Sequence, residues 1–185
     1  MRISLGAKPL CYPQNVFMVA TYAEDGTPDV MNAAWGGISD FQQICLCLSA
    51  SHKTVANLIA RQAFTVSMAT AETVIPCDYV GIESANDVPN KFEKAGFHAT
   101  KSELVDAPLI DELPFALECK VQSYDPKTGL LFGEIVNVSA DESIMDGNNI
   151  DLSKFHPIVF DAVNSGYLTL GERIADAFGC GAALK

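Results

Sequence analysis

The chain has 185 residues, and 49% of them are hydrophobic, which predicts one core and a single domain over residues 1–185. The net charge is −11, with 12 Lys and Arg against 23 Asp and Glu. Because nucleic acids and anionic membranes both require clusters of basic side chains, this balance argues against either as a partner. No apolar run is long enough for a transmembrane helix.

The first half of the chain predicts mainly β-strands. A hairpin that turns at Asp25 and Gly26 and two single strands are expected, over residues 16–35, 42–49 and 63–70. Between the single strands, residues 51–62 predict a helix, because Val55, Leu58 and Ile59 fall on one helical face.

The second half is less regular at first. Residues 72–114 contain one short helix candidate, which ends at Gly96. A second hairpin follows over residues 115–141, and the chain closes with a short strand, a glycine-rich link and a short C-terminal helix. These elements predict a mainly β fold with peripheral helices, in which an antiparallel sheet closes into a barrel.

The six cysteines form no C-x-x-C pair, and their spacing offers no tetrahedral zinc site. Most are expected to be buried thiols in a reducing compartment. The N-terminus has no signal-peptide pattern. A cytoplasmic location is therefore expected.

The helix predicted over residues 51–62 begins with a surplus of donors. Ser51, His52, Lys53 and Thr54 are consecutive and follow Ser49. A helix N-terminus binds anions through its unpaired N–H groups, and donor side chains around it suit a phosphate. The alternative is simple capping of the helix by a serine or threonine.

The segment "MNAAWGG" precedes these donors in the chain. Asn32 offers an amide, Ala33 and Ala34 let the backbone approach a flat ligand, and Trp35 offers an aromatic ring. The alternative is structural, with Trp35 as a core or interface side chain and the glycines as the end of the strand.

The order of motifs resembles the flavin reductase-like, FMN-binding split-barrel family, and within it the flavoredoxin type. The resemblance runs over nearly the whole chain. It is carried by "EDGTPDVMNAAW", "LSASHKTVANL", "FTVSMA", "VPNKFEKAGFHAT", "APLIDELPFALECKV", "LFGEIVNV" and "YLTLGE".

The resemblance implies a six-stranded antiparallel split β-barrel, a homodimer and one FMN per subunit near the dimer interface. It also implies that the segment matching "NAAW" lies along the isoalloxazine ring and that "SASHKT" holds the ribityl chain and the phosphate. The implied FMN-binding residues are Asn32, Ala33, Ala34, Trp35, Ser49, Ala50, Ser51, His52, Lys53, Thr54, Asn57, Ser67 and Lys91.

Three departures from the family pattern stand out. Ser67 takes the place of an asparagine that is frequent in relatives, and the loop before the phosphate-binding helix has no arginine. Lys53 or Lys91 is expected to supply that positive charge. Around Cys77, the segment "CDYVGIESAN" replaces the usual glycine pattern of the loop that meets the nicotinamide.

The function implied by this resemblance is an NAD(P)H-dependent flavin reductase. Hydride passes from the nicotinamide to flavin N5, and no catalytic side chain is required, because the chemistry belongs to the cofactor. Two alternatives remain open. One is a non-enzymatic FMN electron carrier that docks to a redox protein partner. The other is a flavin-free split-barrel binding module.

Overall fold

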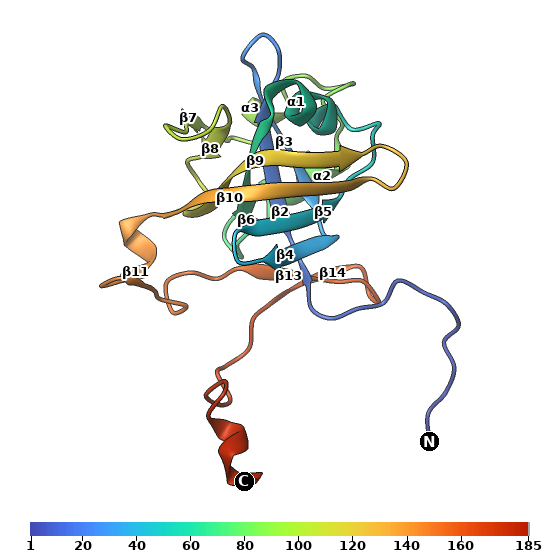
Figure 1. Ribbon diagram of the computed structural model, residues 1–185, viewed down its shortest axis with the longest axis vertical. Coiled ribbons are helices and arrows are strands. Elements are labelled where there is room, and N and C mark those ends of the chain that lie inside the picture. Colours follow the sequence, from blue (N-terminus) through green and yellow to red (C-terminus); the bar gives the residue numbers. More distant parts are fainter. Residues whose placement is uncertain (185) are drawn as a thin grey trace.

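The computed structural model describes residues 1–184, apart from the side chain of Ala183. The main feature is a curled antiparallel sheet that forms a half-barrel (Figure 1). Its strand order is β3-β2-β6-β9-β10-β5-β4. The strands are β2 (Phe17–Tyr22), β3 (Pro28–Ala33), β4 (Gly36–Asp40), β5 (Gln43–Cys47), β6 (Ala63–Met68), β9 (Phe115–Asp125) and β10 (Leu130–Ala140). The predicted mainly β class and split-barrel architecture are confirmed.

At β2 the sheet buries both of its faces, because nearly every residue of this strand is buried and successive side chains point to opposite sides. On β2, Phe17 and Val19 point into the barrel core with Leu46, and Met18 points to the opposite side. That second core also receives Val80 from the helical layer. Two apolar clusters therefore hold the helices against the sheet.

The main sheet has seven strands in the described residues, one more than expected. The additional strand is β4, which pairs with β5 at the edge of the sheet. Glycine allows this pairing, because a Cβ atom on Gly36 would lie 2.5 Å from the Cys45 carbonyl oxygen. The Gly36-Gly37 pair predicts only a strand end from sequence, and it proves instead to start a closely packed strand.

In the described part of the chain, three α-helices lie on the sheet: α1 (Lys53–Arg61), α2 (Val74–Ile82) and α3 (Lys91–Lys94). The predicted helix over residues 51–62 corresponds to α1. Helix α2 lies in the stretch that looked irregular from sequence. Its mostly apolar sequence, VIPCDYVGI, lacks the amphipathic period that marks a surface helix.

Smaller elements surround the half-barrel. One small sheet joins β1 (Gln14–Asn15), β13 (Ile158–Asp161) and β14 (Gly166–Thr169). Two further pairs join β7 (Ala99–Lys101) to β8 (Pro108–Ile110) and β11 (Met145–Asp146) to β12 (Asn149–Ile150). Over residues 1–184 the structure also has two 3₁₀ segments, η1 (Glu142–Ile144) and η2 (Cys180–Leu184).

Both ends of the described chain extend away from the half-barrel (Figure 1). The C-terminal segment carries the short helix η2 and exposes Ile174 and Phe178 almost fully. Among the described residues, no helix combines the length and the apolar character needed to cross a lipid bilayer.

Candidate functional site

Four cavities form a groove along one side of the sheet, since neighbouring cavities share lining residues. The first, of about 560 Å³, shares Lys53 and Ala85 with the second, of about 220 Å³. The second shares Asn32 with a third of about 290 Å³, and the third shares Ala34 with a fourth of about 390 Å³. The groove therefore runs from the β2–β3 turn past the start of α1 to the N-terminal segment.

The second cavity collects most of the side chains predicted around the helix start. Its lining includes His52, Lys53 and Thr54 from α1 and its cap, Asn32 from β3, and Lys91 from α3. His52, Lys53 and Thr54 are consecutive, and Asn32 and Lys91, which are distant in sequence, join them because α1, β3 and α3 pack together.

Helix α1 starts without a side-chain cap. His52 is the N-cap residue in an extended conformation, and no side chain accepts a hydrogen bond from the first turn. Burial, and next the nearby Lys91 ammonium, lower the pKa of His52, so its imidazole is neutral at neutral pH. The first amides of α1 therefore remain open to an anion in the cavity.

Ser49 and Ser51 hydrogen-bond to each other in front of α1, with 3.0 Å between their hydroxyl oxygens. Both are exposed, as is Ala50 between them. The amide of Asn86 donates to the Ser51 carbonyl at 3.1 Å and ties this turn to the loop after α2. None of Ser49, Ala50 and Ser51 lines the four cavities.

The Thr54 and Lys91 side chains belong to a buried polar cluster that also contains Asp29. The Thr54 hydroxyl donates to Asp29 Oδ2 at 2.7 Å, and Lys91 Nζ lies 3.7 Å from Asp29 Oδ1. Lys91 Nζ also donates to the carbonyl oxygens of Val80 and Glu83, both at 2.9 Å. These two side chains thus already have partners within the protein.

Lys53 is the cation that remains for a ligand. It forms no ion pair or side-chain hydrogen bond with the described residues, and it lies between the first and second cavities. The sequence left Lys53 and Lys91 as alternative sources of the charge that an arginine supplies in relatives. The partners of Lys91 favour Lys53.

The segment of residues 32–35 divides between groove and core. The Asn32 amide donates to the Cys77 carbonyl at 3.3 Å, which holds α2 against β3. Ala33 is buried in the barrel core, whereas Ala34 lines the third and fourth cavities. Trp35 is half-exposed and lines the fourth cavity.

Asn57 and Ser67 are buried side chains with an unused hydrogen-bonding atom. Asn57 is 4% exposed, and its Nδ2 has no acceptor among the described residues. It lines the first cavity. Ser67 is fully buried on β6, its hydroxyl also lacks a partner there, and it lines none of the four cavities.

Sequence reasoning missed the wall of the third cavity formed by Asp78, Phe160 and Tyr167. The Tyr167 hydroxyl donates to Asp78 Oδ1 at 2.6 Å, and burial, followed by this hydrogen bond, raises the pKa of Tyr167 to about 12. The motif "YLTLGE" contains Tyr167 and was a signal for it. Asp29 lies in the motif "EDGTPDVMNAAW" in the same way, but it was not named among the site residues.

Cys77 lies near the groove but is buried in α2. Burial raises the pKa of its thiol to about 11. The thiol is therefore protonated at neutral pH, and reactive cysteines have the opposite property. Cys77 is an inert packing residue in this structure.

The residues of the groove fit a flavin mononucleotide. The open amides of α1 and the Lys53 ammonium suit its phosphate, and the small residues along the third cavity admit a flat ring. Together, the split half-barrel and this groove define the class of split-barrel flavoproteins.

Comparison with known proteins agrees with that class. A family model described as the flavin reductase-like domain matches residues 10–161, and the chain belongs to this family. The predicted family is thereby confirmed, and the assignment supports FMN as the cofactor.

Solved structures give the same result. Flavoredoxin of Desulfovibrio vulgaris (Miyazaki F) is 37% identical, with a TM-score of 0.92, over 98% of this chain and 100% of that one. Flavoredoxin from Methanosarcina acetivorans is 22% identical, with a TM-score of 0.87, over 100% of this chain and 98% of that one. Nitrilotriacetate monooxygenase component B from Bacillus cereus is 18% identical, with a TM-score of 0.78, over 95% of this chain and 100% of that one. The last two show the fold alone.

Proposed function

We propose that the chain is an FMN-binding oxidoreductase, an NAD(P)H-dependent flavin reductase of the flavoredoxin type. The observation that carries this proposal is the second cavity, where the open start of α1, His52 and Lys53 face one small space. A helix N-terminus with a nearby ammonium is suited to a phosphate group. The family match and the flavoredoxin of Desulfovibrio vulgaris support the same reading.

The bound flavin would supply the hydride acceptor, at its N5 atom, for hydride from the nicotinamide. The protein's own residues bind and orient. Lys53 and the amides of α1 neutralise the phosphate. The buried contacts of Asp29 with Thr54 and Lys91 hold α1 and α3 against β3.

The proposal needs no acid or base from the protein, because hydride transfer moves no separate proton. The side chains nearest the third cavity accord with this. Tyr167 has its pKa raised to about 12 and stays protonated. Asp78, which lines the same cavity, accepts a hydrogen bond from that hydroxyl.

The purified protein tests the proposal directly. It should be yellow, and anaerobic addition of NADH or NADPH should bleach the flavin absorbance. Lys53→Gln should weaken FMN binding about ten- to a hundredfold, because one hydrogen bond to a charged group contributes about 1.5–3 kcal/mol. Lys94→Gln, on exposed α3 surface, is the matched control and should leave FMN affinity unchanged. A colourless protein that takes up no added FMN would contradict the proposal and favour a flavin-free module.

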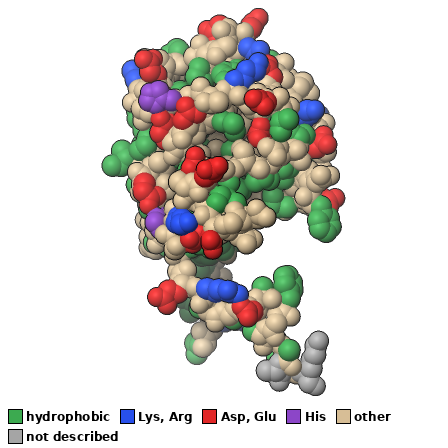
Figure 2. All heavy atoms as spheres, turned by 90° about the vertical axis from the view of Figure 1, so that its left-hand side faces the viewer, with side chains coloured by type: hydrophobic (Ala, Val, Ile, Leu, Met, Phe, Trp, Pro, Cys, Tyr) green, Lys and Arg blue, Asp and Glu red, His purple; other side chains and the backbone are tan. Residues whose placement is uncertain are grey.

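A second candidate is a non-enzymatic FMN carrier that exchanges electrons with a protein partner. The net charge of −11 and the many acidic side chains on the face in Figure 2 favour docking to a basic protein. Flavin that bleaches only with a reduced protein donor, and not with either nicotinamide, would select this candidate.

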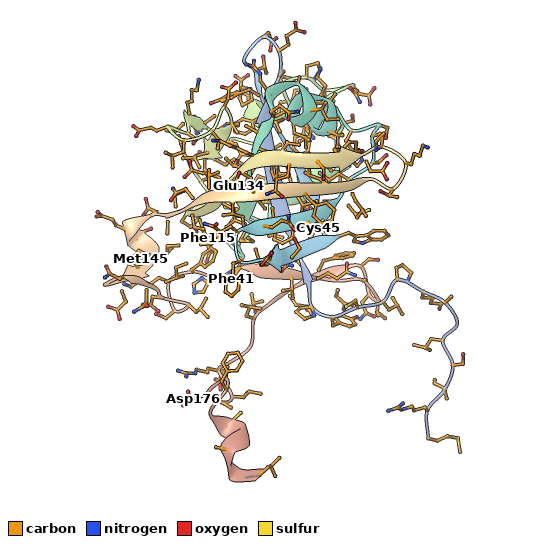
Figure 3. The ribbon with its side chains drawn as sticks, viewed as in Figure 1. Phe41, Cys45, Phe115, Glu134, Met145 and Asp176 are labelled. Atoms are coloured by element: carbon orange, nitrogen blue, oxygen red, sulfur yellow. The ribbon has the colours of Figure 1, made fainter. Side chains whose placement is uncertain are left out.

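A homodimer and a cytoplasmic location are parts of the proposal. The edge strand β4 and its end expose Trp35, Ile38 and Phe41, and Phe41 is labelled at this edge in Figure 3. Apolar residues on an open sheet edge are typical of a surface that another chain covers. Phe41→Asp should therefore shift the protein toward monomer in analytical ultracentrifugation. A wild-type protein that sediments as a monomer would refute the dimer.

A further inference from the structure

A fifth cavity, of about 360 Å³, lies outside the flavin groove. It opens between the β7–β8 hairpin, the segment of residues 113–116 that leads into β9, and the end of β10, and we call it the hairpin cavity. None of its lining residues lines any of the four groove cavities. Its volume falls in the range of about 300–1,000 Å³ that is typical of ligand sites. The proposed function does not use it.

The floor of the hairpin cavity is apolar. Leu113 and Ala116 are buried side chains of this floor. The half-buried Phe115, labelled in Figure 3, packs against Phe155 with 5.8 Å between the ring centroids. Such a floor suits the alkyl part of a long side chain, because their contact removes apolar surface of both from water.

The rim of the hairpin cavity carries two carboxylates, and no Lys or Arg of the described chain lines it. Asp111 directly follows β8 and Asp141 directly follows β10, so the two acids come from different walls. The Asp111 carboxylate forms no hydrogen bond or ion pair with the described residues. Asp141 Oδ1 accepts from the Ser143 amide at 2.8 Å, and hydrogen bonding by Ser143 lowers the pKa of Asp141, so it is ionised at neutral pH. The rim therefore favours a cation.

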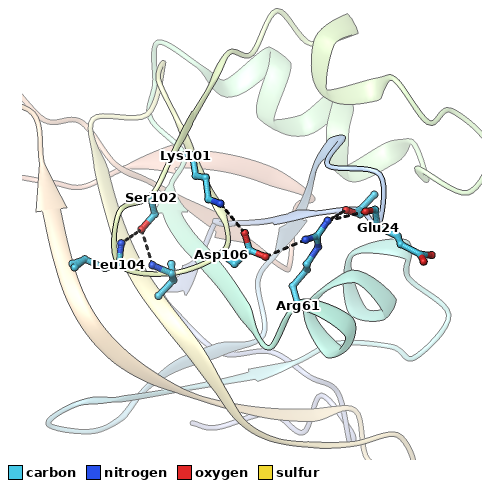
Figure 4. Close-up of polar contacts among 8 residues, drawn as sticks. Glu24, Arg61, Lys101, Ser102, Leu104 and Asp106 are labelled. Carbon is cyan, nitrogen blue, oxygen red and sulfur yellow. Dashed lines mark hydrogen bonds and ion pairs between the residues drawn. The ribbon is translucent and has the colours of Figure 1, made fainter.

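Three basic side chains around the hairpin already have acidic partners. Asp106, between β7 and β8, pairs with Arg61 Nη1 at 3.1 Å and with Lys101 Nζ at 3.3 Å (Figure 4). His98 Nδ1 lies 2.6 Å from Glu112 Oε1. These contacts hold the hairpin in place, so the cavity is preformed, and they leave its rim without a basic partner from these three side chains.

The surface around the hairpin cavity is acidic. The hairpin and β11 lie at the left in Figure 1, and Figure 2 turns this side to the viewer and shows many acidic side chains on it. Glu142 in η1 and Asp146 in β11 are both exposed. Together with the net charge of −11, such a face attracts and orients basic proteins. A side chain of a basic protein is therefore the occupant that charge complementarity favours.

An arginine side chain matches the groups of the hairpin cavity. Its alkyl stem suits the apolar floor, and its planar guanidinium presents five N–H donors that bind carboxylates from more than one side. The hydroxyl groups of Thr100 and Ser139 also line the cavity and offer further acceptors. A guanidinium is more weakly hydrated than the ammonium of lysine, so its entry into a partly apolar cavity costs less.

We propose that the hairpin cavity is a docking site for an arginine side chain of a basic protein partner. The alkyl stem would lie on Leu113, Phe115 and Ala116, and the guanidinium between Asp111 and Asp141. The proposal goes beyond the flavin function, because the cavity shares no residue with the flavin groove and the contact needs no cofactor. Arginines that fill a pocket are often the residues on which an interface most depends.

Titration of the purified protein with the tripeptide acetyl-Gly-Arg-Gly-amide, followed by nitrogen-15 NMR, tests this proposal. Amide signals of residues 109–116 and 139–141 should shift, with a dissociation constant of about 1–10 mM for this single anchoring side chain. The peptide with citrulline in place of arginine has the same shape and no charge, and it should bind at least about tenfold more weakly. The lysine peptide should also bind more weakly.

Asp111→Asn combined with Asp141→Asn should weaken binding of the arginine peptide at least about tenfold. The fold should be retained, because Asp111 is exposed and asparagine also caps a helix start. Glu134→Gln combined with Glu172→Gln is the matched control. It removes the same charge from exposed positions outside the cavity and should change the affinity by less than about twofold.

Three results would overturn the proposal: no shifts around the cavity, a citrulline or lysine peptide that binds as tightly as the arginine peptide, or an equal loss in the control variant. Free arginine separates a protein partner from a free amino acid. Its own carboxylate would face the acidic rim, so it should bind more weakly than the peptide, and tighter binding would also overturn the proposal. Flavin absorbance in the same samples reports on the flavin site separately.

Discussion

Replacement of Lys91 by methionine tests whether the buried cluster supports the fold. The substitution keeps an unbranched apolar stem and removes the ammonium. It eliminates the contact with Asp29 Oδ1 at 3.7 Å and the hydrogen bonds to the Val80 and Glu83 carbonyls at 2.9 Å. Lys91 and Asp29 are both 3% exposed, so solvent cannot replace the lost partner.

The magnitude follows from this geometry. Removal of one member of a buried ion pair costs about 3–5 kcal/mol, because the remaining charge is left uncompensated. Burial of the ammonium is itself unfavourable and lowers the pKa of Lys91. Removing the ammonium therefore offsets part of the cost of about 3–5 kcal/mol. We expect a net loss of about 3 kcal/mol in the free energy of unfolding, or about 6–12 °C in Tm for a chain of this size.

Urea denaturation of the flavin-free protein, followed by circular dichroism, measures the effect. Lys94→Met on the same helix is the matched control, because Lys94 is exposed and forms no ion pair among the described residues. A double-mutant cycle with Asp29→Asn should give a coupling energy of about 1–3 kcal/mol. A loss for Lys91→Met within about 0.5 kcal/mol of that for Lys94→Met would refute the reasoning.

Three further predictions concern stability and thiol reactivity. Thr54→Val should lower the free energy of unfolding by about 1–3 kcal/mol, because it leaves an Asp29 oxygen without its donor, and an unchanged denaturation midpoint would contradict this. Gly36→Ala should also destabilise the protein, since its Cβ would lie 2.5 Å from a backbone oxygen; a Tm equal to wild type would show that β4 can shift. Iodoacetamide at neutral pH should label the exposed Cys11 and spare Cys77, whose pKa is raised to about 11 by burial, until the protein is denatured. Equal labelling rates in the native protein, read by peptide mass spectrometry, would show that the region of Cys77 opens.

The pattern of residues along the chain was sufficient for the fold class. Alternating apolar residues and the turn at Asp25 and Gly26 are local signals, because side-chain direction in a strand depends only on the period of two. Strand β4 and helix α2 were missed for the opposite reason. The Gly36 pairing depends on close contact with β5, and α2 has apolar residues on most sides although only Cys77 and Val80 are buried, so it shows no amphipathic period.

The phosphate end of the candidate site was predicted only as a set of donors. The sequence indicates that Ser51, His52, Lys53 and Thr54 gather at one helix start, and α1 does begin there. Which of these donors are free for a ligand depends on contacts with distant parts of the chain. The Thr54 hydroxyl donates to Asp29, and Lys53 has no partner among the described residues. The alternative interpretation, a serine or threonine cap, does not hold, because no side chain caps α1.

The sequence by itself thus determined the mainly β architecture, the family and the position of a helix start rich in donor side chains, since all three depend on order and spacing along the chain. Only the tertiary structure decided that Lys91 belongs to the buried polar cluster and that Asn57 Nδ2 lines a cavity with no acceptor from the described residues. The physical reason is that a hydrogen bond or ion pair is chosen among all groups brought within reach. That choice is made when β3, α1, α2 and α3 pack together.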